Sequence, residues 1–192
     1  MSLIPEFELG LWNAWIFMVP SLLLMLLCLL VMTKKGAPGG AESSRVSKPT
    51  LLLGIITKFY YFAAVIYSVF LPLKLWTIWF YVGLPITLIG LVGSLVVLVS
   101  WAITPAGEPV TRGLYRYSRH PMYVTMFLLL LGVSIASASW VFLLFSIIGG
   151  VGAVYFIKME EAFTLGHYGT AYREYMNRTP RWLGIPKSEK KE

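Results

Sequence analysis

The chain has 192 residues, of which 57% are hydrophobic and only 13% are charged, and its mean hydropathy is +0.72. Soluble domains carry about 25% charged residues, so the composition excludes an ordinary soluble protein and predicts a single integral membrane domain over residues 1–192. The net charge of +7 lies in connecting segments. This distribution favours contact with anionic membrane lipids and does not favour nucleic acid as a partner.

The first half of the chain, residues 1–100, predicts three membrane spans. Residues 10–32, 51–73 and 76–101 are each apolar and long enough to cross a bilayer core, which needs about 20 helical residues. Residues 33–50 join the first two and combine basic residues with glycine, proline and serine, which predicts a positively charged loop. Gly83, Gly90 and Gly93 lie within the third span and predict close helix packing.

The second half, residues 101–192, predicts a loop, a helical hairpin and a tail. Residues 123–157 carry no charge, and one helix of that length would reach about 52 Å, which is too long for a bilayer. We therefore expect spans at 121–136 and 139–158 with a tight turn near 134–140. The predicted fold class is all-α, a polytopic membrane helical bundle of about five transmembrane helices with a cytoplasmic C-terminal helical tail.

The basic residues of the chain predict its orientation. They gather in loop 33–50, in loop 102–122 and in the tail from Lys158, whereas the N-terminus and the 134–140 turn carry none. With five spans, the excess of positive charge on cytoplasmic segments places the N-terminus outside and the C-terminus in the cytoplasm. The three basic segments then share one face of the membrane.

Loop 102–122 ends in a block of basic and aromatic residues that can bind a ligand. Arg119 and His120 precede Pro121, which suits the first position of a helix and leaves backbone N–H groups free nearby. Such groups, with an arginine, suit a carboxylate or a phosphate. Tyrosines of the same block offer faces for a planar base or a cation; they are Tyr115, Tyr117 and Tyr123.

An acidic pair, Glu160 and Glu161, lies where the last predicted span leaves the membrane. The hairpin returns this pair to the face that carries the basic block. Neighbouring residues on a helix point about 100° apart, so one glutamate faces a site and the other caps it or binds a loop. Together the two blocks predict a pocket for a zwitterionic, aromatic ligand. The alternative interpretation is a belt of arginine and tyrosine at the membrane interface.

Several other kinds of site are not favoured by the sequence. The chain has His120, His167 and one cysteine, Cys28, which form no metal-binding pattern. It has no aspartate, which excludes Ser-His-Asp chemistry. The glycines between residues 149 and 152 lie inside an apolar helix, where they favour helix packing over a phosphate loop.

The motifs of the second half, taken together, resemble a known superfamily. The run 113–123 (GLYRYSRHPMY), two apolar spans, the pair at 160–161, the run 172–175 (YREY) and the pair at 180–181 (PR) resemble the isoprenylcysteine carboxyl methyltransferase and phospholipid N-methyltransferase superfamily over about residues 100–185. The resemblance implies an integral membrane methyltransferase that uses S-adenosylmethionine. Its acceptor would be a lipid-like or small hydrophobic molecule that reacts through a carboxylate, an amine or a thiol.

The resemblance also implies the residues of the site. Those implied as catalytic are Arg119, Glu160 and Glu161. Those implied to contact the cofactor are Gly107, Glu108, Pro109, Val110, Tyr115, His120, Pro121, Met122, Tyr123 and Glu160, of which 107–110 match by spacing alone. The chain departs from the pattern twice: Thr125 stands where many members have glycine, and Phe156 stands where the prenylcysteine enzymes have arginine. The second departure favours an acceptor other than a prenylcysteine carboxylate.

The sequence leaves two other functions open. The catalytic half of sterol reductases resembles the same fold and motif but binds NADPH, in chains with many more spans. A membrane protein without catalytic activity could keep the motif for packing. Titration with S-adenosylhomocysteine and with NADPH separates these alternatives from a methyltransferase.

Overall fold

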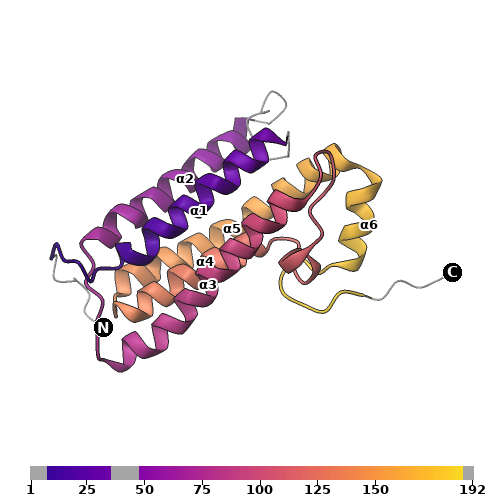
Figure 1. Ribbon diagram of the computed structural model, residues 1–192. Helices are drawn as coiled ribbons and strands as arrows, with labels where there is room; N and C mark the ends of the chain where they lie inside the picture. Colours follow the sequence, from indigo (N-terminus) through magenta and orange to yellow (C-terminus); the bar gives the residue numbers. More distant parts are fainter. Residues whose placement is uncertain (1–7, 36–47, 188–192) are drawn as a thin grey trace.

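The computed structural model describes residues 8–35 and 48–187, and it confirms the predicted all-α class. Five of the helices form an elongated bundle, and a sixth lies across one end of it (Figure 1). In chain order the elements are α1 (Trp15–Lys34), α2 (Lys48–Val69), α3 (Ile78–Ile103), the 3₁₀ turn η1 (Gly113–Arg116), α4 (Pro121–Ala136), α5 (Trp140–Tyr168) and α6 (Thr170–Arg178).

The apolar helices follow the predicted spans closely. The predicted hairpin is confirmed, and α4 has the predicted bounds 121–136. Helix α5 runs past residue 158 as far as Tyr168, so the tail begins as a continuation of the last apolar helix. Helices α1, α3 and α5 are long and apolar enough to cross a membrane, while Phe59–Val69 of α2 and the whole of α4 are shorter apolar segments. Multiple membrane helices are thus present, and a crossing by all five stays a prediction.

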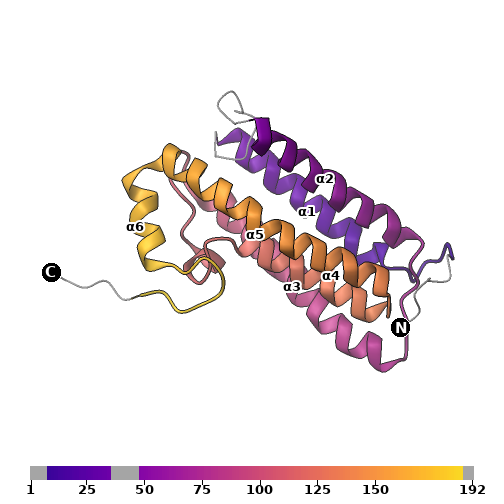
Figure 2. The same ribbon diagram turned by 180° about the vertical axis from the view of Figure 1, so that it is seen from behind.

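Helices α1 to α5 alternate in direction, so the bundle has two distinct ends (Figures 1 and 2). The site end holds the last turns of α1, α3 and α5 together with η1 and α6. The far end holds the turn between α4 and α5 and the segment between α2 and α3. The described parts of the three basic segments therefore lie at one end, as predicted; residues 36–47 of the first loop lie outside the described residues. Which side of the membrane this end occupies stays a prediction.

Glycines bring α3 and α4 into direct backbone contact. A Cβ atom on Gly83 or Gly90 of α3 would overlap backbone atoms of α4, and a Cβ on Gly132 of α4 would overlap the backbone of Thr87 on α3. Close packing of small residues is a main source of helix association in lipid. The predicted role of the glycines in α3 is confirmed, and they fix α4, which carries the motif residues, against α3.

Thr125, which departs from the superfamily pattern, is accommodated by the same seam. A Cβ on Gly93 of α3 would overlap the methyl group of Thr125. The hydroxyl of Thr125 donates to the carbonyl of Met122 at 3.1 Å. The hydroxyl of Ser94 on α3 donates to the hydroxyl oxygen of Thr125 at 3.2 Å. Gly93 therefore provides the room that the larger residue on α4 needs.

The far end is closed by backbone hydrogen bonds between segments. The N–H of Ala14 donates to the carbonyl of Leu71 at 2.8 Å, and the N–H of Lys74 donates to the carbonyl of Ala136 at 3.0 Å. Ser139 caps α5 by accepting from the N–H of Phe142 at 3.2 Å. Exposed tryptophans surround this end; these residues, here named the Trp ring, are Trp12, Trp76, Trp79 and Trp140.

Lys35, directly after α1, bonds to the end of α3. The ammonium group of Lys35 donates to the carbonyls of Trp101 at 2.9 Å and Ala102 at 2.8 Å, and also to the carbonyl of Thr104. These are carbonyls at the C-terminus of α3, which lack partners within the helix and carry the negative end of its dipole. Lys35 thereby sets where the loop after α3 begins.

Candidate functional site

A hollow that is open to solvent lies at the site end between the loop after α3, the start of α4, the end of α5 and helix α6. It is lined by Trp101, Pro109, Val110, Tyr115, Arg119, His120, Met122, Tyr123, Glu160, Thr164, Tyr168, Tyr172 and Tyr175. The lining is thus largely aromatic, with a few polar groups that converge from four elements.

The inner wall of the hollow is fixed around Tyr115. Its hydroxyl accepts from the indole N–H of Trp101 at 2.9 Å, and its carbonyl accepts from the hydroxyl of Tyr175 at 2.7 Å. Gly113 begins this turn with a φ of 60°, a conformation that glycine adopts without steric cost. A residue of α3 and a residue of α6 therefore hold the same turn from opposite sides.

The start of α4 corrects one sequence-based expectation. Pro121 occupies the first helical position as predicted, but the N–H groups around it are largely satisfied within the chain. The N–H of His120 donates to the hydroxyl of Ser118 at 3.1 Å, and the N–H groups of Tyr123 and Val124 donate to the carbonyl of His120 at 3.1 and 3.4 Å. The local turn therefore takes three of the donors near Pro121, those of His120, Tyr123 and Val124.

The two glutamates have different surroundings, and Glu161 is the buried member of the pair. It is 4% exposed and accepts from Nε2 of His120 at 3.1 Å and from both Nε (3.1 Å) and a terminal nitrogen (2.5 Å) of Arg181. A terminal nitrogen of Arg119 lies 3.3 Å from it. The expectation that one glutamate binds a loop is confirmed, because Glu161 joins loop 102–122, here named the motif loop, to the tail after α6.

The ionisation of Glu161 follows from these contacts. Glu161 lies beyond the predicted span 139–158, in the last part of α5. Burial by itself raises the pKa of its carboxyl group. Hydrogen bonds from His120 and Arg181 and the charge of Arg119 lower the pKa by more than burial raises it, so the pKa is about 2. The carboxylate is therefore a fixed negative charge at neutral pH.

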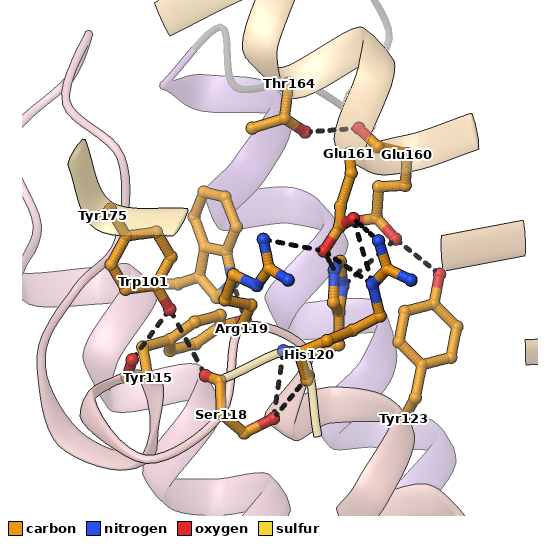
Figure 3. Close-up of polar contacts among 11 residues, drawn as sticks. Trp101, Tyr115, Ser118, Arg119, His120, Tyr123, Glu160, Glu161, Thr164 and Tyr175 are labelled. Atoms are coloured by element: carbon orange, nitrogen blue, oxygen red, sulfur yellow. Dashed lines mark hydrogen bonds and ion pairs between the residues drawn. The ribbon is translucent and has the colours of Figure 1, made fainter. Parts of the chain in front are cut away.

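Glu160 is the glutamate that faces the hollow (Figure 3). One carboxylate oxygen accepts from the hydroxyl of Tyr123 at 2.8 Å and lies 3.8 Å from Nδ1 of His120. Its side chain is 27% exposed, whereas that of Glu161 is 5% exposed. Glu160 can therefore accept further hydrogen bonds from a ligand in the hollow.

Arg119 lines the hollow and keeps one donor without a partner. Its side chain is 11% exposed, and one terminal nitrogen pairs with Glu161 at 3.3 Å. Its Nε is buried and has no hydrogen-bond partner among the described residues. Buried donors are nearly always satisfied in folded proteins, so this N–H is an exception among the described residues.

The structure brings most of the predicted site residues together. Those that line the hollow are Pro109, Val110, Tyr115, Arg119, His120, Met122, Tyr123 and Glu160. Gly107 and Glu108 instead line a smaller adjoining depression with Lys35. Pro121 is buried as the helix start, and Glu161 lies outside the lining. Within residues 8–35 and 48–187 no cluster of histidine, cysteine and acidic side chains is placed to hold a metal ion.

Other lining residues were not among the predicted site residues. Thr164 and Tyr168 follow Glu160 at intervals of four along α5, and Tyr172 continues the interval into α6. Residues four apart share one helix face, so this spacing was a signal in the sequence. The hydroxyl of Thr164 donates to the carbonyl of Glu160 at 2.7 Å.

Phe156 lies one helical turn before Glu160, at the position where the prenylcysteine enzymes of the superfamily carry arginine. Its ring packs against that of Tyr123, with 6.1 Å between the ring centroids. An apolar aromatic contact thus stands beside Glu160 at this position.

Fold and hollow together define a helical membrane protein with an aromatic, polar ligand site at one end of its bundle. Residues 80–171 match the phospholipid methyltransferase family. The chain is also 37% identical, over 78 residues, to the protein-S-isoprenylcysteine O-methyltransferase of Schizosaccharomyces pombe; the match covers 40% of this chain and 32% of that protein's length. No solved structure matches the chain significantly. The chain therefore carries a domain of the phospholipid methyltransferase family, and the predicted superfamily is confirmed.

Proposed function

We propose that the chain is a membrane methyltransferase that uses S-adenosylmethionine and acts on a lipid-like or small hydrophobic acceptor at the cytoplasmic face. The observation that carries the proposal is the position of Glu160. It faces the hollow beside Arg119 and several tyrosines, within a segment that matches a methyltransferase family. The matched segment, residues 80–171, contains nearly all of α3 and the whole of η1, α4 and α5.

The polar groups of the hollow fit a zwitterionic donor. Glu160 would hold an ammonium group, since its carboxylate faces the hollow with acceptor capacity left. Arg119 would hold a carboxylate through its guanidinium group, since the residue lines the hollow. The rings of Trp101, Tyr115 and Tyr172 offer faces for a planar base.

S-adenosylmethionine supplies a methyl group that is activated for SN2 transfer by a sulfonium cation. The residues of the chain contribute position and exclusion of water. The hydrogen bond from Tyr123 fixes the orientation of the Glu160 carboxylate. Helix α6 covers the hollow with Tyr172 and Tyr175, which are buried.

The surroundings of Glu160 support an amine or a thiol as the acceptor group over a carboxylate. Phe156 and Tyr123 make the wall beside Glu160 aromatic. Among the described residues that line the hollow, Arg119 is the one arginine or lysine, and its charge is opposed by Glu161. The same charge balance favours S-adenosylmethionine over NADPH, whose 2′-phosphate needs an additional cation.

Calorimetric titration of the purified chain with S-adenosylhomocysteine and with NADPH tests the donor. We expect binding of S-adenosylhomocysteine alone; binding of NADPH alone would support the reductase, and binding of neither would support a protein without this activity. Membranes that contain the chain are then incubated with a radiolabelled methyl donor and a panel of lipid amines, thiols and carboxylates. Labelling confined to carboxylates would contradict the proposed acceptor class.

A further inference from the structure

Exposed apolar side chains gather where the tail after α6 meets the motif loop. Leu183 is 66% exposed and Ile185 is 90% exposed, values typical of side chains without a packing partner. Trp182 and Tyr117 are 40% and 50% exposed. With the exposed cations beside them they form a surface here named the tail patch, which consists of Arg116, Tyr117, Trp182, Leu183, Ile185 and Lys187.

The tail patch is held in this exposed arrangement by its backbone. The N–H of Gly184 donates to the carbonyl of Tyr117 at 3.0 Å, and the N–H of Lys187 donates to the carbonyl of Arg178 at 2.9 Å. The N–H of Arg119 donates to the carbonyl of Pro180 at 3.0 Å. The segment is therefore ordered before it meets a partner, and docking would cost little conformational entropy.

The tail patch also lies at the level where an apolar helix begins. Tyr117 precedes the start of α4 at Pro121 by one short turn, and the Trp ring lies near the other end of α4. The 16 residues of α4 span about 24 Å at 1.5 Å per residue. With the turns at each end, the two aromatic groups are separated by about the 30 Å of a bilayer core. Tryptophan and tyrosine concentrate at both interfaces of such a layer.

We propose that the tail patch docks on the anionic phospholipid surface of the bilayer that holds the bundle. Its apolar side chains would enter the headgroup region, and Arg116 and Lys187 would contact anionic headgroups. A second copy of the chain is a poorer partner, since it would bring the same cations together. The inference concerns a surface outside the hollow and does not depend on methyl transfer.

A single label at position 185 tests the proposal in the full chain. In a Cys28→Ala background, a spin label is attached at Ile185→Cys or, as a control, at Asn177→Cys, an exposed position on α6. Each protein is placed in bilayer discs of phosphatidylcholine alone or with one third phosphatidylglycerol. Collision with an aqueous nickel relaxant reports exposure to water. We expect position 185 to be protected in the anionic discs, with 1 M salt removing the protection, and position 177 to remain exposed.

Charge variants make the test specific. A cation near an anionic surface contributes roughly a fivefold preference for the docked state, so Arg116→Gln with Lys187→Gln should lower the docked-to-free ratio about 25-fold. Arg173→Gln, an exposed cation of α6, is the matched control and should change little. Equal exposure of positions 185 and 177 in anionic discs would overturn the proposal. So would protection that is the same in both lipid mixtures, or dipolar broadening between labels that indicates a second copy.

Discussion

The far end and the site end of the bundle are held together by different kinds of interaction. Main-chain hydrogen bonds close the far end, such as that from Ala14 to Leu71. The site end also has main-chain bonds, such as that from Arg119 to Pro180, but a buried ionic cluster is added to them. Three side chains from two segments converge on the single carboxylate of Glu161. A main-chain contact tolerates substitution, whereas a buried ionic cluster depends on every member. The site end is therefore the more easily lost of the two, and the following variants test this difference.

Replacing Glu161 with alanine should have the largest effect. It would leave the cations of Arg119 and Arg181 close together without their shared anion, and breaking a buried ion pair costs about 3–5 kcal/mol. We expect a lower melting temperature and loss of S-adenosylhomocysteine binding, measured by thermal melting and calorimetry. Glu174→Ala, an exposed glutamate on α6, is the control. Unchanged melting would show that the cluster contributes nothing to stability.

Replacing Glu160 with glutamine should weaken binding of the methyl donor while leaving the fold intact. A charged hydrogen bond in a partly buried site is worth about 1.5–3 kcal/mol, which corresponds to roughly 10- to 150-fold in affinity. The measurement is calorimetric titration with S-adenosylhomocysteine beside Glu174→Gln. If the Glu160→Gln protein bound as tightly as the parent, Glu160 would have no part in donor binding.

Replacing Arg119 with lysine sharpens the comparison, because it keeps the charge and removes the planar fork. Lysine cannot form the paired hydrogen bonds of a guanidinium group, so we expect donor affinity to fall about tenfold, in line with one charged hydrogen bond. His120→Ala is the companion variant. Thermal melting shows whether each variant is folded. A folded Arg119→Lys protein with normal affinity would favour the alternative in which the arginine is part of an interfacial belt.

Replacing Ser139 with alanine tests the far end. It removes the cap of α5, which should cost about 1 kcal/mol. We expect slightly lower thermal stability and unchanged S-adenosylhomocysteine affinity, because the site end has its own contacts. A marked fall in affinity would mean that the two ends are coupled.

Lowering the pH should destabilise the site end before it destabilises the rest of the bundle. The pKa of Glu161, about 2 in the folded chain, lies below the usual glutamate value of about 4.3. Its ion pairs therefore contribute stability in full above pH 4.3, and this contribution is lost as the pH falls toward 2. Proteolysis of the tail after α6, compared between pH 6 and pH 3, should increase before helix content falls. Simultaneous loss of both would contradict this order.

The sequence was sufficient for the features that depend on local pattern. The absence of charge over residues 123–157, together with bilayer thickness, predicted the hairpin, and the structure places α4 at 121–136. Glycine spacing predicted the seam between α3 and α4. The interval of four after Glu160 was also local and could have identified Thr164 and Tyr168.

The remaining features depend on contacts between distant segments. The identity of the buried glutamate follows from Arg181, which approaches Glu161 only when the tail folds back. The N–H groups near Pro121 were expected to be free, but Ser118 and His120 satisfy those of His120, Tyr123 and Val124. Neither result can be obtained from periodicity, because each requires the geometry of a closed loop.

The contact between Gly93 and Thr125 has an evolutionary consequence. The two positions face each other across the α3–α4 seam with no space to spare, so their side-chain volumes are constrained as a sum. A lineage can enlarge one residue only if the other is small. In relatives that carry glycine at the position of Thr125, we expect alanine or a larger residue opposite it, and the pair should covary although neither residue lines the hollow.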